Sequence, residues 1–152
     1  ISGSAFQECQ IKELTSDSFP VLEIVGYEGF AYCPITLVNL PSLISIGDKG
    51  FKDCNILKQF SVEKLEEIGY MCFSGCYQLS SIYCNLQPDK FTCDGGYLCH
   101  CPICQYQLAE CLKRGKMDRL TKNVEKVRQM QLRIMKSSGT LQKQQANSLY
   151  KA

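Results

Sequence analysis

The sequence predicts an α/β solenoid, in which short coils of chain stack on one another and share one core. Three observations support this prediction. A nine-residue pattern occurs four times, the copies follow one another at a spacing near 22 residues, and aliphatic residues recur at matching positions between them. A unit of this length cannot bury its own apolar face, so the copies must stack to be stable.

The repeated pattern is an aliphatic residue, usually a glycine, two variable residues, a small residue, Phe, two variable residues and Cys. The copies span residues 1–9, 25–33, 46–54 and 68–76. Stacking is expected to bury the phenylalanines and to line up the cysteines as a ladder of small apolar side chains. The Phe positions are Phe6, Phe30, Phe51 and Phe73, the small positions are Ala5, Gly29, Gly50 and Cys72, and the Cys positions are Cys9, Cys33, Cys54 and Cys76.

Each predicted coil has two walls. Short strands are expected near residues 11–14, 35–40, 57–62 and 79–84, and stacking turns them into a short parallel sheet on one wall. The Phe–x–x–Cys half is expected to form the opposite wall as a helical turn. The glycines that open the pattern, Gly26, Gly47 and Gly69, are expected at tight bends with positive φ.

This pattern, followed by Leu-x-x-Ile, resembles the BspA-like leucine-rich repeat, a family common in surface proteins of bacteria and parasitic protists. The resemblance covers about residues 1–84. It implies leucine-rich-repeat coils and, more loosely, adhesion or protein binding at a cell surface. The sequence therefore divides into a solenoid of about four coils at 1–84, a cysteine-rich cap at 85–115 and a basic helical tail at 116–152. Because the chain opens inside a repeat, it is expected to be part of a larger chain or assembly.

Six cysteines lie outside the repeat positions, and five of them fall close together. One explanation is a set of three disulfides that closes the open end of the solenoid in an oxidising compartment, with no cofactor. The alternative is one structural zinc held by Cys101-Pro-Ile-Cys104 and completed from among Cys93, Cys99, His100 and Cys111. Free thiols are the third possibility. The six are Cys84, Cys93, Cys99, Cys101, Cys104 and Cys111.

Charge is distributed unevenly along the chain. Residues 1–111 hold 6 Lys/Arg and 13 Asp/Glu, a net charge of −7, whereas residues 112–152 hold 11 and 2, a net charge of +9. The basic tail is therefore expected to meet an acidic partner or the acidic body of its own chain.

The tail is predicted to be helical. One helix is expected at 104–114, ended by Gly115, and a second at 116–136, ended by Ser137-Ser-Gly139, with a polar segment at 140–152. One face of the second helix forms an apolar seam suited to a coiled coil or to docking on the solenoid. The seam consists of Met117, Leu120, Val124, Val127, Gln131 and Ile134.

Catalysis, a small-molecule substrate and nucleic-acid binding are not expected. The chain has one His and no nucleophile-elbow, P-loop or zinc-protease motif, and the basic tail carries no recognised nucleic-acid motif. Two hypotheses stay open: an adhesion or recognition module outside the cell, and an intracellular scaffold whose tail docks on an acidic assembly such as a cytoskeletal filament. In the first, the partner contacts the variable residues of the sheet, which are Lys12, Glu13, Thr36, Asn39, Lys58, Gln59, Ser61, Ser80 and Ser81.

Overall fold

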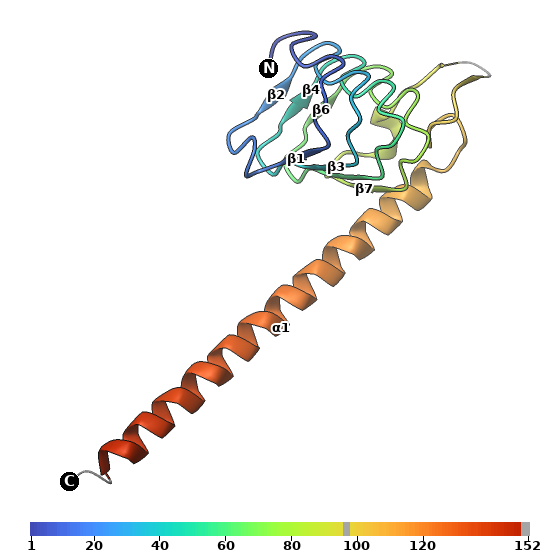
Figure 1. Cartoon of the computed structure of the whole chain (residues 1–152). Helices are drawn as coiled ribbons and strands as arrows, with labels where there is room; N and C mark the ends of the chain where they lie inside the picture. The colour runs from blue at the N-terminus through green and yellow to red at the C-terminus, as the bar shows by residue number, and fades with distance from the viewer. Residues whose placement is uncertain (96–97, 150–152) are drawn as a thin grey trace. The chain divides into compact units, whose positions relative to one another are not determined.

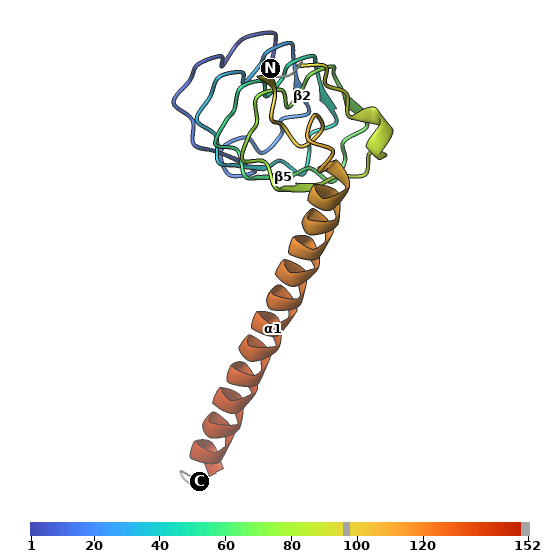
Figure 2. The same ribbon diagram turned by 90° about the vertical axis from the view of Figure 1, so that its right-hand side faces the viewer.

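A computed structural model describes residues 1–95 and 98–149 of the chain, with side chains up to residue 137. The chain forms two compact units, Ile1–Met117 and Asp118–Ala152. The first unit is a solenoid of stacked coils, so the predicted fold class is confirmed. Figure 2 views the solenoid end-on, so successive coils overlap as nested loops.

The sheet predicted from the repeat is present as four parallel strands in the order β1-β3-β5-β7. The strands are β1 (Glu13–Thr15), β3 (Leu37–Asn39), β5 (Gln59–Ser61) and β7 (Ser81–Tyr83). The central residue of each strand points into the core and is buried, and the four central residues lie in register. They are Leu14, Val38, Phe60 and Ile82.

A second parallel sheet, in the order β2-β4-β6, was not predicted. Its strands are β2 (Ile24–Val25), β4 (Ser45–Ile46) and β6 (Glu67–Ile68), and each ends directly before one of the glycines that open the repeat pattern. Strands of two residues are too short to show an alternating pattern in the sequence. Strand hydrogen bonds therefore join the coils along two walls rather than one.

The expectation of positive φ at these glycines is wrong, because the only described glycine with positive φ is Gly75. Close packing between the backbones of successive coils explains these glycines instead. A Cβ placed on Gly47 would lie 2.9 Å from both Gly26 C and Tyr27 N, in the backbone of the preceding coil. Glycine is required at this position because two backbones approach too closely for any side chain.

The Phe–x–x–Cys segments form non-helical turns, so the expected helical turn is also wrong. Residues such as Tyr32 and Asp53 adopt left-handed φ values of 60° and 55°. Some turn amides bond between coils: Phe30 N–H donates to Gly50 O over 2.9 Å, and Phe51 N–H to Cys72 O over 3.1 Å. Others bond within one turn, such as Lys52 N–H to Lys49 O over 2.9 Å. The turns thus form a third wall of hydrogen-bonded rungs.

All seven phenylalanines join one network of ring contacts in the core. Five of them stack nearly parallel as a column, with centroid separations of 5.3, 5.7, 6.3 and 6.3 Å. The column consists of Phe6, Phe30, Phe51, Phe73 and Phe91. Its last ring was missed because Phe91 lies outside the Phe–x–x–Cys pattern. Phe19 and Phe60 meet the column edge-on.

A single helix, α1 (Leu108–Leu149), replaces the two helices predicted in the tail. Gly115 does not end a helix, and neither does Ser137-Ser-Gly139. A Cβ on Gly115 would collide with the carbonyl oxygen of Ile82 in β7, so this glycine serves close packing within the first unit. No helix in the described part of the chain is both long and apolar enough to span a bilayer.

Candidate functional site

The outer face of the β1-β3-β5-β7 sheet gathers most of the side chains predicted to bind a partner. Outward positions of neighbouring strands align in two rows, such as Glu13–Leu37–Gln59 and Asn39–Ser61. Neighbouring residues within such a row are about 4.8 Å apart, the spacing between adjacent strands. Five of the nine predicted residues are exposed on this wall: Lys12, Glu13, Asn39, Lys58 and Gln59.

Four predicted face residues are less available. Thr36, Ser61 and Ser80 are half-buried. The Thr36 hydroxyl donates to Lys12 O over 3.1 Å, and the Ser80 hydroxyl to Lys58 O over 3.4 Å, so both hydroxyls link successive coils.

Ser81 is only 6% exposed, so the prediction that it is available to a partner on the outer face is wrong. The start of α1 covers this edge of the sheet. Its Gly115 lies against Ile82, and the Cys111 thiol donates to Leu79 O over 3.5 Å.

The turn wall carries a group of tyrosines and lysines that the sequence reasoning missed. Lys49 Nζ lies 5.4 Å from the ring centroid of Tyr27, and Lys52 Nζ lies 5.2 Å from that of Tyr32. Lys52 also donates to the Tyr32 hydroxyl over 2.8 Å. Each pair joins two successive coils. The available signal was a Tyr at a variable position of one repeat copy and a Lys at a variable position of the next.

The repeat cysteines are buried hydrogen-bond donors. Apart from the half-buried Cys9 of the first copy, each thiol reaches the carbonyl of the phenylalanine one coil earlier: Cys33 to Phe6 O over 2.9 Å, and Cys54 to Phe30 O over 3.1 Å. Cys76 repeats the contact with Phe51 O. Burial raises the pKa of Cys54 to about 12, so its thiol stays protonated at neutral pH. These positions act in packing rather than in chemistry.

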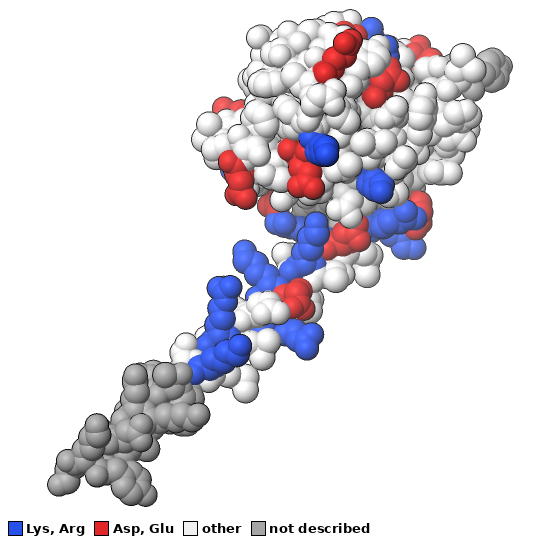
Figure 3. All heavy atoms as spheres, in the orientation of Figure 1, with Lys and Arg blue, Asp and Glu red and all other residues white. Residues whose placement is uncertain are grey.

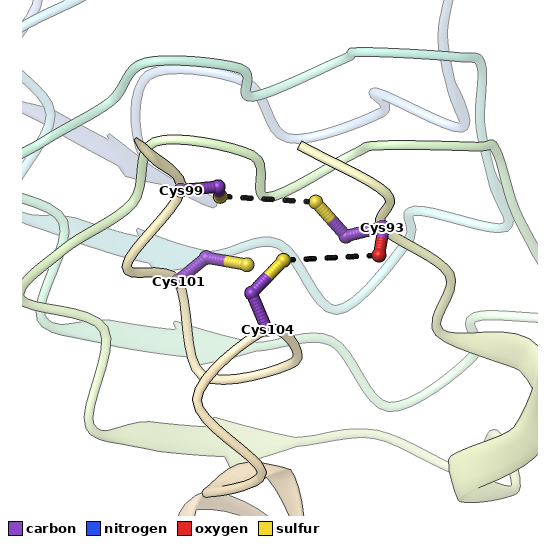
Figure 4. Close-up of side chains that lie close together, drawn as sticks. All are labelled: Cys93, Cys99, Cys101 and Cys104. Atoms are coloured by element: carbon purple, nitrogen blue, oxygen red, sulfur yellow. Dashed lines mark hydrogen bonds between the residues drawn. The ribbon is translucent and has the colours of Figure 1, made fainter. Parts of the chain in front are cut away.

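Four cysteines of the cap form a distinct cluster. The Sγ atoms of Cys93, Cys99, Cys101 and Cys104 all lie within 4.8 Å of one another. Figure 4 shows the four side chains converging on one small space. Cys93 Sγ and Cys99 Sγ are 3.8 Å apart, and the Cys104 thiol lies 3.7 Å from Cys93 O. All eleven cysteines of the structure are free thiols.

The cluster contains four of the seven residues predicted for a disulfide or zinc site. It includes Cys99 and leaves out Cys84, Cys111 and His100. Cys111 donates to Leu79 O, and the His100 ring nitrogen Nδ1 pairs with the Gln105 amide at 3.2 Å. The sequence placed Cys101 and Cys104 together through their two-residue spacing, but it contained no signal that ranked Cys99 above Cys111.

Hydrogen bonds polarise the cluster. Burial alone would raise the pKa of Cys99. Backbone N–H groups of Cys101 and Gly75 and the Ser74 hydroxyl outweigh burial and lower this pKa to about 6. Burial and the neighbouring Cys93 raise the pKa of Cys104 to about 11. The thiol of Cys99 therefore ionises more easily than that of Cys104.

The described part of α1 presents a basic surface with exposed apolar side chains, and Lys and Arg dominate its charges in Figure 3. The predicted seam is exposed: Leu120, Val124, Val127 and Ile134 each keep more than half of their surface accessible. A shallow hollow of about 350 Å³ lies along it, lined in part by Leu120, Val124 and Gln131.

Comparison with known protein families shows the family to which the solenoid belongs. A family model described as the BspA type leucine rich repeat region matches residues 1–95 in six copies. The chain belongs to this family. The BspA-type repeats extend past the predicted boundary at residue 84 and include Phe91, the last ring of the column. Searches of curated proteins and of solved structures each found no match to the chain.

Proposed function

We propose that this BspA-type leucine-rich-repeat chain is a non-catalytic protein-binding module, and that its partner contacts the outer face of the β1-β3-β5-β7 sheet. One observation carries the proposal: five polar side chains predicted for binding are exposed in, or directly before, the strands of a sheet whose inner residues are buried. A rigid scaffold with variable outward residues lowers the entropic cost of binding, because little has to become ordered in the complex.

The chemistry of the face indicates what kind of surface it binds. Lys12, Lys58, Asn39 and Gln59 offer hydrogen-bond donors, and Glu13 is the one acidic group among the five exposed residues. A protein surface rich in carboxylates and carbonyl oxygens complements this set.

A matched pair of charge reversals tests the proposal. A photoreactive amino acid in place of Gln59 is first used to capture and identify the partner. The partner is then purified, and its affinity is measured for the wild-type chain and for two variants without the photoreactive group. Lys58→Glu is expected to weaken binding roughly tenfold, about 1.4 kcal/mol, because it places a carboxylate opposite an acidic surface. Lys64→Glu makes the same charge change at an exposed position outside the sheet face and is expected to leave the affinity unchanged. Equal losses in both variants would contradict the assignment.

The basic helix supports a second candidate function, docking on an acidic assembly such as a cytoskeletal filament. Residues 112–152 carry a net charge of +9. Neutralising Lys122, Lys126 and Arg133 to Gln is expected to abolish most pelleting with an acidic filament at low salt. Raising the salt concentration should have the same effect in the wild type, because screening weakens contacts between exposed charges. Pelleting that resists both changes would exclude electrostatic docking.

Adhesion at a cell surface remains a finer prediction, implied by the family. The state of the cap cysteines distinguishes the two settings, because stable disulfides require an oxidising compartment, whereas reduced or metal-bound thiols fit the cell interior.

A further inference from the structure

We infer that Cys93, Cys99, Cys101 and Cys104 bind one zinc ion through their four sulfur atoms, and that this site closes the open end of the solenoid. The inference is independent of the partner-binding proposal, because it concerns different residues and a different ligand.

The spacing of the sulfurs fits the metal. Zinc bound tetrahedrally at about 2.3 Å from each sulfur separates neighbouring sulfurs by about 3.8 Å. Cys93 Sγ and Cys99 Sγ are 3.8 Å apart, and all four sulfurs lie within 4.8 Å of one another. A disulfide instead needs about 2.05 Å and joins only two sulfurs. Four converging sulfurs match one shared metal ion better than they match pairs.

The chain around the cluster is shaped for four ligands. Cys101 and Cys104 flank a tight turn in which Gln105 N–H donates to Cys101 O over 3.0 Å. A two-residue spacing on a turn is the usual way in which one segment supplies two zinc ligands. Beside the cluster, a Cβ on Gly95 would lie 3.0 Å from Cys99 Sγ and 3.1 Å from Ser74 Oγ. Glycine is therefore needed where the chain passes the sulfurs.

The hydrogen bonds of the turn wall show what the cluster replaces. The residue two after each of the first three column phenylalanines donates its N–H to a carbonyl of the next coil, as in Tyr32 to Lys52 O over 2.8 Å and Asp53 to Ser74 O over 2.7 Å. Gly75 is the same position in the last Phe–x–x–Cys turn, and its N–H points to Cys99 Sγ at 3.5 Å. Cys99 Sγ thus takes the place of the carbonyl acceptor that the next coil supplies at this position in the earlier turns.

These donors also suit a zinc–thiolate group. The hydroxyl of Ser74 lies 3.7 Å from Cys99 Sγ, beside the Gly75 N–H. Donors of this kind around the ligands orient the sulfurs and stabilise their negative charge. Each thiol that coordinates zinc releases its proton to solvent, and nothing is oxidised or reduced. An open hollow of about 680 Å³, lined in part by Cys93, Cys99 and Cys104, gives the ion a route in from solvent.

The first experiment uses the wild-type full chain. The chain is reduced, loaded with Zn²⁺, freed of excess metal and assayed for metal content. The expected result is one zinc per chain, with Cys93, Cys99, Cys101 and Cys104 protected from alkylation until a chelator removes the metal. Co²⁺ in place of zinc should give the intense visible bands of a tetrahedral thiolate site. Mapping the alkylated peptides needs no variant, so it decides even where a substitution prevents folding.

Matched variants separate the ligands from the neighbouring cysteine and histidine. Cys93→Ser and Cys104→Ser are each expected to weaken zinc binding roughly a hundredfold or more, beyond the loss that accompanies changes around the ligands. Cys111→Ser and His100→Gln are expected to keep one zinc per chain, because neither side chain reaches the cluster. Three results would overturn the inference: no bound zinc, protection of a different set of cysteines, or a disulfide within the four in protein whose thiols were blocked at lysis.

Discussion

At the scale of single residues, each position of the repeat has one role in packing the coils. The column phenylalanines fill the interior, the pattern glycines let backbones pass, and the repeat thiols donate to a carbonyl one coil away. The phenylalanine and cysteine roles could be predicted from the sequence, because a side chain that recurs in every coil has to meet its own copies. The glycine role was missed, because a sequence does not show how closely two backbones approach.

The phenylalanine column predicts a graded response to truncation. Phe51 is fully buried and stacked on both sides, so Phe51→Ala is expected to reduce the free energy of unfolding by about 3–5 kcal/mol. Phe6 is only half-buried at the first coil, so Phe6→Ala should cost clearly less. Denaturant unfolding of both variants measures the difference, and equal losses would argue against a stacked column.

The buried repeat thiols predict low reactivity. Raising the pKa of Cys54 from 9.0 to about 12 reduces its thiolate fraction below pH 9 by roughly a thousandfold. Folding thus favours the protonated thiol. Its contribution to stability is intact below about pH 9 and declines as pH rises toward 12.

Alkylation at pH 8, followed by peptide mapping, measures this reactivity. The expected result is that the half-buried Cys9 is modified well before Cys54 in the folded chain. Similar rates would show that Cys54 is not enclosed.

At the scale of elements, α1 illustrates how a local signal can mislead. A glycine in a helical pattern commonly marks a helix end, and Gly115 was interpreted in that way. In the structure it lies within α1, opposite the Ile82 carbonyl of β7. The contact joins residues far apart in the sequence, so no rule based on neighbouring residues could have found it.

The sign of the stability change caused by Gly115→Ala therefore tests this contact. In a helix with free space, alanine is about 1 kcal/mol more favourable than glycine. Here the added Cβ meets backbone of β7, so the variant is expected to lose about 1–3 kcal/mol of stability instead. Thermal unfolding of the solenoid unit gives the sign, and a stabilised variant would show that α1 does not pack closely on β7.

At the scale of the whole molecule, the repeat made the solenoid predictable, and the ends of the solenoid were the harder part. Strand positions followed from periodic aliphatic residues, but Phe91 and the choice of Cys99 over Cys111 did not, because both lie where the pattern breaks down. The last coil is followed by the sulfur cluster and the start of α1. Closure of that end is thus a tertiary property, set by which segments meet there.

Successive coils share one interior through the phenylalanine column. Proton NOE spectroscopy of the chain with labelled phenylalanine rings tests it most directly. The expected result is an unbroken series of ring-to-ring cross peaks linking Phe30, Phe51 and Phe73 and continuing to Phe91. Absence of cross peaks between Phe30 and Phe51 in the folded chain would contradict the stacked solenoid.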